Sequence, residues 1–205
     1  MRLGVLILPE DPWPDARRKW QRAEQLGFDH AWTYDHLAWR GLRDSPWFGA
    51  VPTLAAAAAV TSTIRLGTLV ASPEVRHPVP FVIAANGPRS LRLAVEYGAG
   101  WVTTGGSAET LEQWWVAVGV LARRLDDTLA EAGRDRASLD RYLLLDSSPV
   151  FSLSSADLFE EMAGRAGDLG FTDVITHWPR PEGVYAGDVA VLEEAASRLP
   201  RLRVP

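Results

Sequence analysis

The chain has 205 residues, 23% of them charged, a formal net charge of −5 and no cysteine. This composition is typical of a soluble globular protein and excludes a largely disordered chain. Without cysteine there are no disulfides, thiolate metal ligands or cysteine nucleophiles. The mild acidity disfavours nucleic-acid binding, and no run approaches the ~20 apolar residues that cross a bilayer, so we expect a cytoplasmic protein with no membrane partner.

Seven segments with strand character alternate with helical segments along the chain. The strands are predicted at 2–8, 28–34, 64–71, 81–85, 100–104, 142–146 and 172–176. The helices are predicted at 14–26, 51–61, 89–97, 108–132, 156–169 and 189–199, the fourth as one long helix or a broken pair. Alternation of this kind is typical of right-handed βαβ units with a parallel sheet, so the fold class is α/β.

The segment 72–80, SPEVRHPVP, is too short for an ordinary crossover between two of these strands. It contains three prolines and no helical pattern, whereas a parallel crossover usually needs ~10–12 residues including a helix. A complete (β/α) barrel usually takes about 250 residues. We therefore predict one domain over 1–205 that forms an incomplete TIM-type (β/α) barrel. It would have about seven mostly parallel strands with surrounding helices, and a missing βα segment near 72–80. An open doubly wound sheet is the alternative, although its GxGxxG fingerprint is absent after the first strand.

Several separated motifs resemble the bacterial luciferase-like monooxygenases, a family of flavin- and deazaflavin-dependent oxidoreductases. They are LGVLILPE at 3–10, HAWTYDH at 30–36, RLGTLVASPEVRHP at 65–78, VIAANGPRSLRLAVEYGAGWVTTGG at 82–106 and DVITHWPRP at 173–181. The resemblance implies a barrel that binds FMN or a deazaflavin coenzyme. The sequence departs from the family where His77-Pro78 runs directly into the segment that resembles the fifth family strand. The fourth strand, whose glycine-rich end helps hold the cofactor in the family, is missing.

The resemblance places a catalytic pair, Asp35 and His36, at the carboxyl end of the second strand. There the pair would lie against the cofactor ring, with His36 as proton donor or acceptor, a role that suits an imidazole near neutral pH. Glu10 matches a position near the cofactor, and His177 after the last strand could share the same rim. The plainer interpretations are a loop-capping Asp35, a polar rim residue at position 36, a solvent-exposed Glu10 and a structural His177.

Further candidate cofactor-binding residues follow the third and fourth predicted strands. Leu69, Val70 and Ser72 would back the cofactor ring, at a position where family members often carry a cis peptide. By the resemblance, the phosphate-bearing tail would be contacted by Ala85, Gly87, Pro88, Arg89 and Ser90. A Gly-Pro turn into a helix leaves N–H groups that can bind an anion, but an ordinary βα turn uses the same residues. Thr103 and Thr104 could add hydrogen bonds. The four histidines lie far apart in the sequence, so no metal site is expected.

Two functions remain open. The first is a flavin- or deazaflavin-dependent oxidoreductase or monooxygenase that acts on a small molecule. The second is a degenerate family member that has lost its cofactor and acts as a dimeric binding protein. Both predict a homodimer, because a barrel that lacks one strand exposes two sheet edges, which pairing with a second copy would cover.

Overall fold

In the computed structural model, residues 1–35, 42, 45–69 and 80–202 are described. Their strands are β1 (Arg2–Leu6), β2 (His30–Tyr34), β3 (Arg65–Leu69), β4 (Val82–Ala84), β5 (Gly100–Thr103), β6 (Asp140–Leu144) and β7 (Asp173–His177). All neighbouring strands in this part of the chain are parallel. Each strand matches its predicted segment to within two residues at either end.

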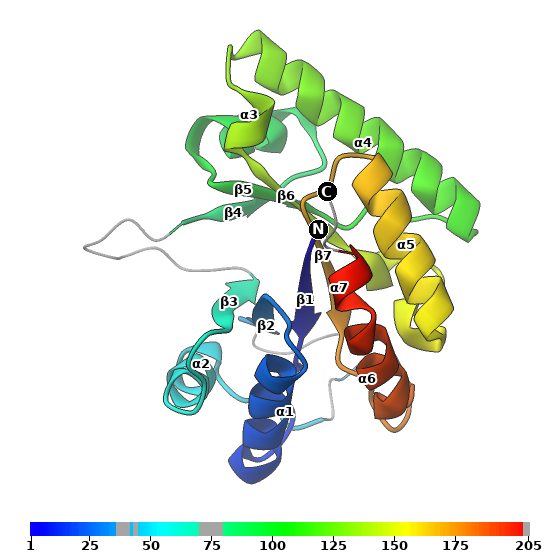
Figure 1. The fold of residues 1–205 in the computed structure, drawn as a ribbon. Coiled ribbons are helices and arrows are strands. Elements are labelled where there is room, and N and C mark those ends of the chain that lie inside the picture. Colours follow the sequence, from blue (N-terminus) through cyan, green and yellow to red (C-terminus); the bar gives the residue numbers. More distant parts are fainter. Residues whose placement is uncertain (36–41, 43–44, 70–79, 203–205) are drawn as a thin grey trace.

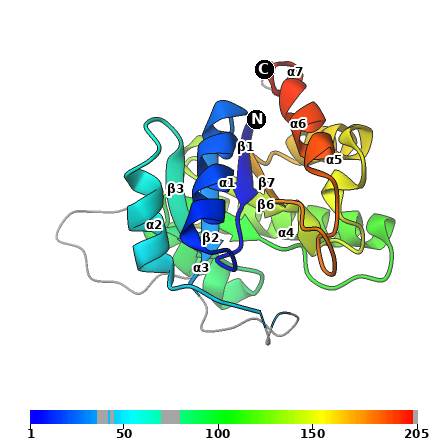
Figure 2. The ribbon, with the colours of Figure 1, turned by 90° about the horizontal axis from the view of Figure 1, so that it is seen from below.

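The helices cover the outer face of the curled sheet (Figures 1 and 2). They are α1 (Trp13–Gln25), α2 (Ala50–Ala58), α3 (Pro88–Tyr97), α4 (Leu111–Glu131), α5 (Ala156–Asp168), α6 (Val189–Ser197) and α7 (Leu199–Leu202). Short 3₁₀ turns lie at Arg136–Ser138, Leu145–Ser147 and Ser152–Ser154. The predicted helix at 108–132 is a single helix, α4. Among the helices of the described residues, none has both the length and the apolar character to cross a bilayer.

In the part of the chain that the structure describes, the strand order is that of a barrel with one strand missing. The sheet runs β3-β2-β1-β7-β6-β5-β4, so the first and last strands of the chain are neighbours. This is the circular order of a (β/α) barrel, opened between β3 and β4 (Figure 1). A doubly wound sheet would place β1 beside β4 instead. The incomplete barrel is confirmed, and its opening lies between β3 and β4.

The sheet separates two apolar layers. On β1, Leu3 and Val5 face the helices and belong to the main core, whereas Leu6 points to the inside of the curl. The same alternation on β6 sends Leu143 outward and Leu144 inward. The inner layer is small, because the missing strand removes side chains that would fill the centre of a complete barrel.

Glycines end two of the helices that lead directly into strands. Gly27 follows α1 with a φ of +81°, and Gly170 follows α5 with a φ of +83°. Only glycine adopts this left-handed conformation without a steric penalty, so each helix ends there and the chain turns back into the sheet. After these turns the chain enters β2 and β7, which flank β1 and run parallel to it. The carboxyl ends of the three strands therefore lie at the same rim.

Candidate active site

A cavity of about 1210 Å³ lies inside the curled sheet. Its walls come from β2 through β6, including both edge strands, and from Tyr185 in the loop after β7. At the carboxyl ends of the strands it is lined by Tyr34, Asp146, Tyr185 and the Thr103-Thr104 pair. Functional groups of parallel barrels gather at this end, so it is the candidate active site.

Three buried side chains at this rim form a hydrogen-bonded array. The Tyr34 hydroxyl lies 3.3 Å from Nε2 of His177, and Nδ1 of His177 lies 3.0 Å from Oδ2 of Asp146. Asp146 also accepts hydrogen bonds from the backbone N–H groups of Ser152 and His177, at 2.9 and 2.5 Å, and from the Thr176 hydroxyl at 3.1 Å. With its side chain fully buried, Asp146 is therefore surrounded by donors.

The donors around Asp146 fix the tautomer of His177. A carboxylate only accepts, so Nδ1 of His177 carries a proton and donates it to Asp146. In the neutral imidazole Nε2 is then the acceptor, and the Tyr34 hydroxyl donates to it. Asp146 thus orients the ring and would stabilise the imidazolium if His177 gained a proton through Tyr34.

Tyr185 covers one face of the His177 ring. Its ring stacks on His177 with centroids 3.6 Å apart and an angle of 16° between the planes. Its backbone has a φ of +63°, in the left-handed region that costs a non-glycine residue energy. Burial and nearby negative charge raise the pKa values of Tyr34 and Tyr185 well above the ordinary value. Both phenols therefore stay neutral donors at physiological pH.

The loop between β4 and α3 is tied to the end of β5. The Thr103 hydroxyl donates to the Asn86 carbonyl oxygen at 2.6 Å. Gly87 is the N-cap of α3 and provides no side-chain oxygen, while the Ser90 hydroxyl accepts from the Gly87 N–H at 3.2 Å. Arg89 is exposed beside this turn and forms no ion pair with the described residues. The first turn of α3 therefore presents N–H donors and a cation to solvent.

The predicted site residues occupy different places in the fold. Leu69 and Ala85 line the cavity. Gly87, Pro88 and Arg89 are exposed at the start of α3, and Ser90 is half-buried there. Asp35 is exposed just beyond β2, and its backbone N–H donates to the Leu69 carbonyl at 3.1 Å. The remaining predictions, His36, Val70 and Ser72, lie outside the described residues, as does the peptide bond at which a cis form was considered.

Glu10 has a partner of its own. Both of its carboxylate oxygens accept hydrogen bonds from Arg180, each at 2.7 Å, and its side chain is only 13% exposed. This two-bond ion pair ties the loop after β1 to the loop after β7. Glu10 is therefore neither solvent-exposed nor among the residues that line the cavity.

Sequence reasoning missed Tyr34, Asp146 and Tyr185. Asp146 ends the predicted strand YLLLD and Tyr34 ends its strand, so a search for polar groups at carboxyl ends of strands would have found both. Nothing comparable marks Tyr185, which reaches the site from a loop and is placed by its stacking on His177.

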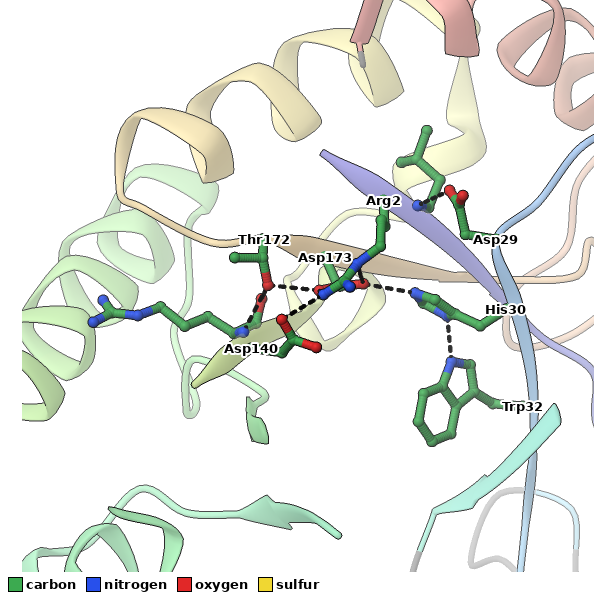
Figure 3. A network of polar contacts seen from close by, with 9 residues as sticks. Arg2, Asp29, His30, Trp32, Asp140, Thr172 and Asp173 are labelled. Carbon is green, nitrogen blue, oxygen red and sulfur yellow. Dashed lines mark hydrogen bonds and ion pairs between the residues drawn. The ribbon is translucent and has the colours of Figure 1, made fainter. Parts of the chain in front are cut away.

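A second polar network lies at the opposite, amino ends of the strands (Figure 3). Asp173 accepts two hydrogen bonds from Arg2, at 2.8 and 2.6 Å, one from Nε2 of His30 at 3.0 Å and one from the Thr172 hydroxyl at 2.6 Å. Nδ1 of His30 accepts from the Trp32 indole at 2.5 Å. Burial alone would raise the pKa of Asp173, but these hydrogen bonds outweigh it and lower that pKa. The network joins β1, β2 and β7.

Comparison with known proteins connects this structure to redox enzymes. Residues 1–79 match the family model described as luciferase-like monooxygenase. An F420-dependent glucose-6-phosphate dehydrogenase from Beutenbergia cavernae is 30% identical over 125 residues, which cover 58% of this chain and 31% of the relative. The match thus spans about a third of the length of that curated relative. The predicted resemblance to the luciferase-like family is confirmed.

Two solved structures share the fold at low sequence identity. An F420-dependent secondary alcohol dehydrogenase, in complex with an F420-acetone adduct, superposes with a TM-score of 0.75 and 12% identity over 99% of both chains. The coenzyme F420 dependent tetrahydromethanopterin reductase from Methanopyrus kandleri gives a TM-score of 0.71 and 14% identity over 98% of this chain and 99% of that one. These similarities show the barrel architecture.

Proposed function

We propose that this chain, whose first 79 residues match the luciferase-like monooxygenases, is a deazaflavin-dependent oxidoreductase that acts on a small molecule. The observation that carries the proposal is the Tyr34–His177–Asp146 array at the carboxyl rim of a large cavity. The F420 dependence of the curated relative and of both structural neighbours supports a deazaflavin in preference to FMN.

The cavity suits a tricyclic ring with an anionic tail. Its volume of about 1210 Å³ exceeds the roughly 300–1,000 Å³ of common ligand pockets. Leu69, Ala84 and Val102 supply apolar walls, and polar groups converge at one end. Beyond that end, the first turn of α3 and Arg89 offer donors and positive charge for a phosphate.

A bound deazaflavin would supply a ring carbon that accepts or gives a hydride. When an alcohol loses a hydride to become a carbonyl, its hydroxyl must also lose a proton. Tyr34 can take that proton at its oxygen while its own proton passes to Nε2 of His177. Asp146 stabilises the resulting imidazolium through Nδ1. In the reverse direction the same array delivers a proton to a carbonyl oxygen.

The proposal also includes Asp35 and His36, the pair that follows β2 in the sequence. Asp35 lies one residue beyond Tyr34, at the same rim. We keep His36 as a candidate proton donor or acceptor at the ring and Asp35 as its neighbour at the cofactor.

The gap between β3 and β4 favours a second candidate function, a dimeric binding protein that has lost its cofactor. In this alternative the missing strand has removed part of the ring site, and a second copy of the chain covers the two open sheet edges. The homodimer is common to both candidates, so the state of assembly does not separate them. Cofactor binding does.

Calorimetric titration of the full chain with a deazaflavin coenzyme, and separately with FMN, tests the proposal. We expect saturable deazaflavin binding that weakens about tenfold or more in Arg89→Gln, because a charge-assisted hydrogen bond contributes about 1.5–3 kcal/mol. Arg92→Gln is the matched control: it changes another exposed arginine of α3. If the folded wild-type chain binds neither cofactor, the second candidate replaces the first. Equal weakening by both variants would refute the assigned tail site.

A further inference from the structure

The cavity extends well beyond the active-site rim. Besides Tyr34 and Asp146 at the carboxyl ends, it is lined by His30 and Arg65, the first residues of β2 and β3. His30 and Tyr34 are four residues apart on one strand, about 13 Å at 3.3 Å per residue. In a complete barrel, layers of side chains fill this interior. Here the described residues leave a cavity that extends from the first residue of β2 to its last.

Three aromatic rings line the amino half of this cavity. His30, Trp32 and Tyr142 contact one another edge to face, with centroid separations of 5.5–5.9 Å. All three are among the residues that face the cavity. They form an aromatic wall that a flat apolar ligand could contact.

A glycine on a neighbouring strand makes room for each ring. A Cβ added at Gly4 would lie 2.1 Å from the His30 ring, one at Gly67 would lie 2.5 Å from Trp32, and one at Gly100 would lie 2.8 Å from Tyr142. Contacts this short do not occur between real atoms, so a larger residue would push the ring away from the sheet. The rings therefore pack directly on the backbone of β1, β3 and β5, and the space above them stays open.

Most polar groups beside these rings are already paired with one another. Arg2, His30 and Thr172 already occupy the oxygens of Asp173, and Arg2 also pairs with Asp140 at 2.7 Å. Both ring nitrogens of His30 are engaged as well.

Arg65 and Tyr142 do not belong to that network of paired groups. Among the described residues neither the Arg65 guanidinium nor the Tyr142 hydroxyl has a hydrogen-bond partner. Both residues line the cavity, Tyr142 as a buried residue and Arg65 as an exposed one. Burial, then the charges of Asp173 and Asp140, raise the pKa of Tyr142 to about 12, so its hydroxyl keeps its proton at neutral pH. A ligand with acceptor oxygens would therefore complement both groups.

We propose that the amino half of the cavity is a second binding site, for a flat aromatic carboxylate. The aromatic group would pack against His30, Trp32 and Tyr142, and the carboxylate would accept hydrogen bonds from Arg65 and from the Tyr142 hydroxyl. Guanidinium and carboxylate match in a two-bond geometry, which makes this pair the strongest contact of the site. The proposal does not require the cofactor: its tail site at α3 lies at the opposite end of the strands, although Val102, an apolar wall for the ring, pairs in register with Tyr142.

Calorimetric titration of the full chain with 2-naphthoate, without cofactor, tests this site. 2-Naphthylmethylamine provides the same rings with the opposite charge. Arg65→Gln removes the cation, Tyr142→Phe removes only the hydroxyl, and Arg17→Gln is the control at an exposed arginine of α1 that does not line the cavity.

We expect 2-naphthoate to bind with one site per chain and the amine to bind at least tenfold more weakly. Arg65→Gln should weaken 2-naphthoate binding about tenfold and Tyr142→Phe severalfold, whereas Arg17→Gln should match the wild type. Arg89→Gln should also match the wild type, which separates this site from the proposed cofactor tail site. Failure of the folded wild-type chain to bind 2-naphthoate would overturn the proposal, as would equal binding by Arg65→Gln.

Discussion

Replacing Asp146 tests whether the buried array is formed as described. Its side chain is fully buried and accepts four hydrogen bonds, one each from Ser152 and Thr176 and two from His177. Asp146→Ala removes the acceptors and leaves three donors without partners, because the Thr176 hydroxyl keeps its contact with the Ser152 hydroxyl at 2.8 Å. Asp146→Asn keeps the shape, but its NH₂ group must face a donor: either the Ser152 N–H or the three donors at Oδ2.

The two variants should differ in stability by a predictable order. Each buried group left unpaired costs about 1–3 kcal/mol, and hydrogen bonds to a charged group such as the Asp146 carboxylate are the stronger ones. We therefore expect Asp146→Ala to lower the free energy of unfolding by about 3–5 kcal/mol, a large part of the 5–15 kcal/mol of a typical domain. Asp146→Asn has one mismatched donor and should lose about 1–3 kcal/mol.

Urea unfolding followed by circular dichroism measures these differences. Asp157→Asn is the matched control, because Asp157 is 86% exposed and pairs with Arg198 at the surface. A surface ion pair contributes at most about 1 kcal/mol, so this variant should lie close to the wild type. If Asp146→Asn were no less stable than Asp157→Asn, the buried hydrogen bonds at His177 would not exist and the reasoning would be refuted.

Three other predictions follow from the structure. Gly67→Ala should destabilise the protein by about 1–3 kcal/mol, because the new Cβ would lie 2.5 Å from Trp32. Gly164→Ala in α5 meets nothing within 4 Å and should stabilise the protein by up to ~1 kcal/mol. The urea midpoints of the two variants check this. Hydrogen bonds from the backbone N–H groups of Thr63, Ile64 and Ser62 lower the pKa of Glu24 from 4.5 to about 2. The stability that Glu24 adds is therefore present above pH 4.5 and lost as the pH falls through 2. An NMR titration that gave an ordinary glutamate pKa would contradict this. The open edges at β3 and β4 predict a dimer, and light scattering that found only monomer at micromolar concentration would rule that out.

The elements could be predicted because each strand is an apolar run bounded by turn residues. The exception is the start of β6, which includes Asp140 and Arg141 ahead of the predicted 142. Arg141 was not expected in a strand, yet it is buried on the outer face and bonded to Asp126 of α4 at 2.5 Å. Local pattern cannot show that a charged residue will find such a partner.

The site was predicted in part for a related reason. The resemblance located the rim and the turn before α3, but the partners of His177 come from residues 31 and 143 positions away. Contacts over such separations depend on the register of β2, β6 and β7. The role of the three glycines that accommodate the aromatic wall likewise cannot be predicted from the sequence, because each contacts a ring on a neighbouring strand.

Hydrogen–deuterium exchange with and without a deazaflavin coenzyme tests the central claim most directly, because it reports where the coenzyme binds. The account predicts slower exchange at 85–91 and 103–106, around the first turn of α3 and the end of β5, with no change along α4 at 111–131. Unchanged exchange at the rim under saturating coenzyme, or slowing confined to the amino ends of the strands, would contradict it.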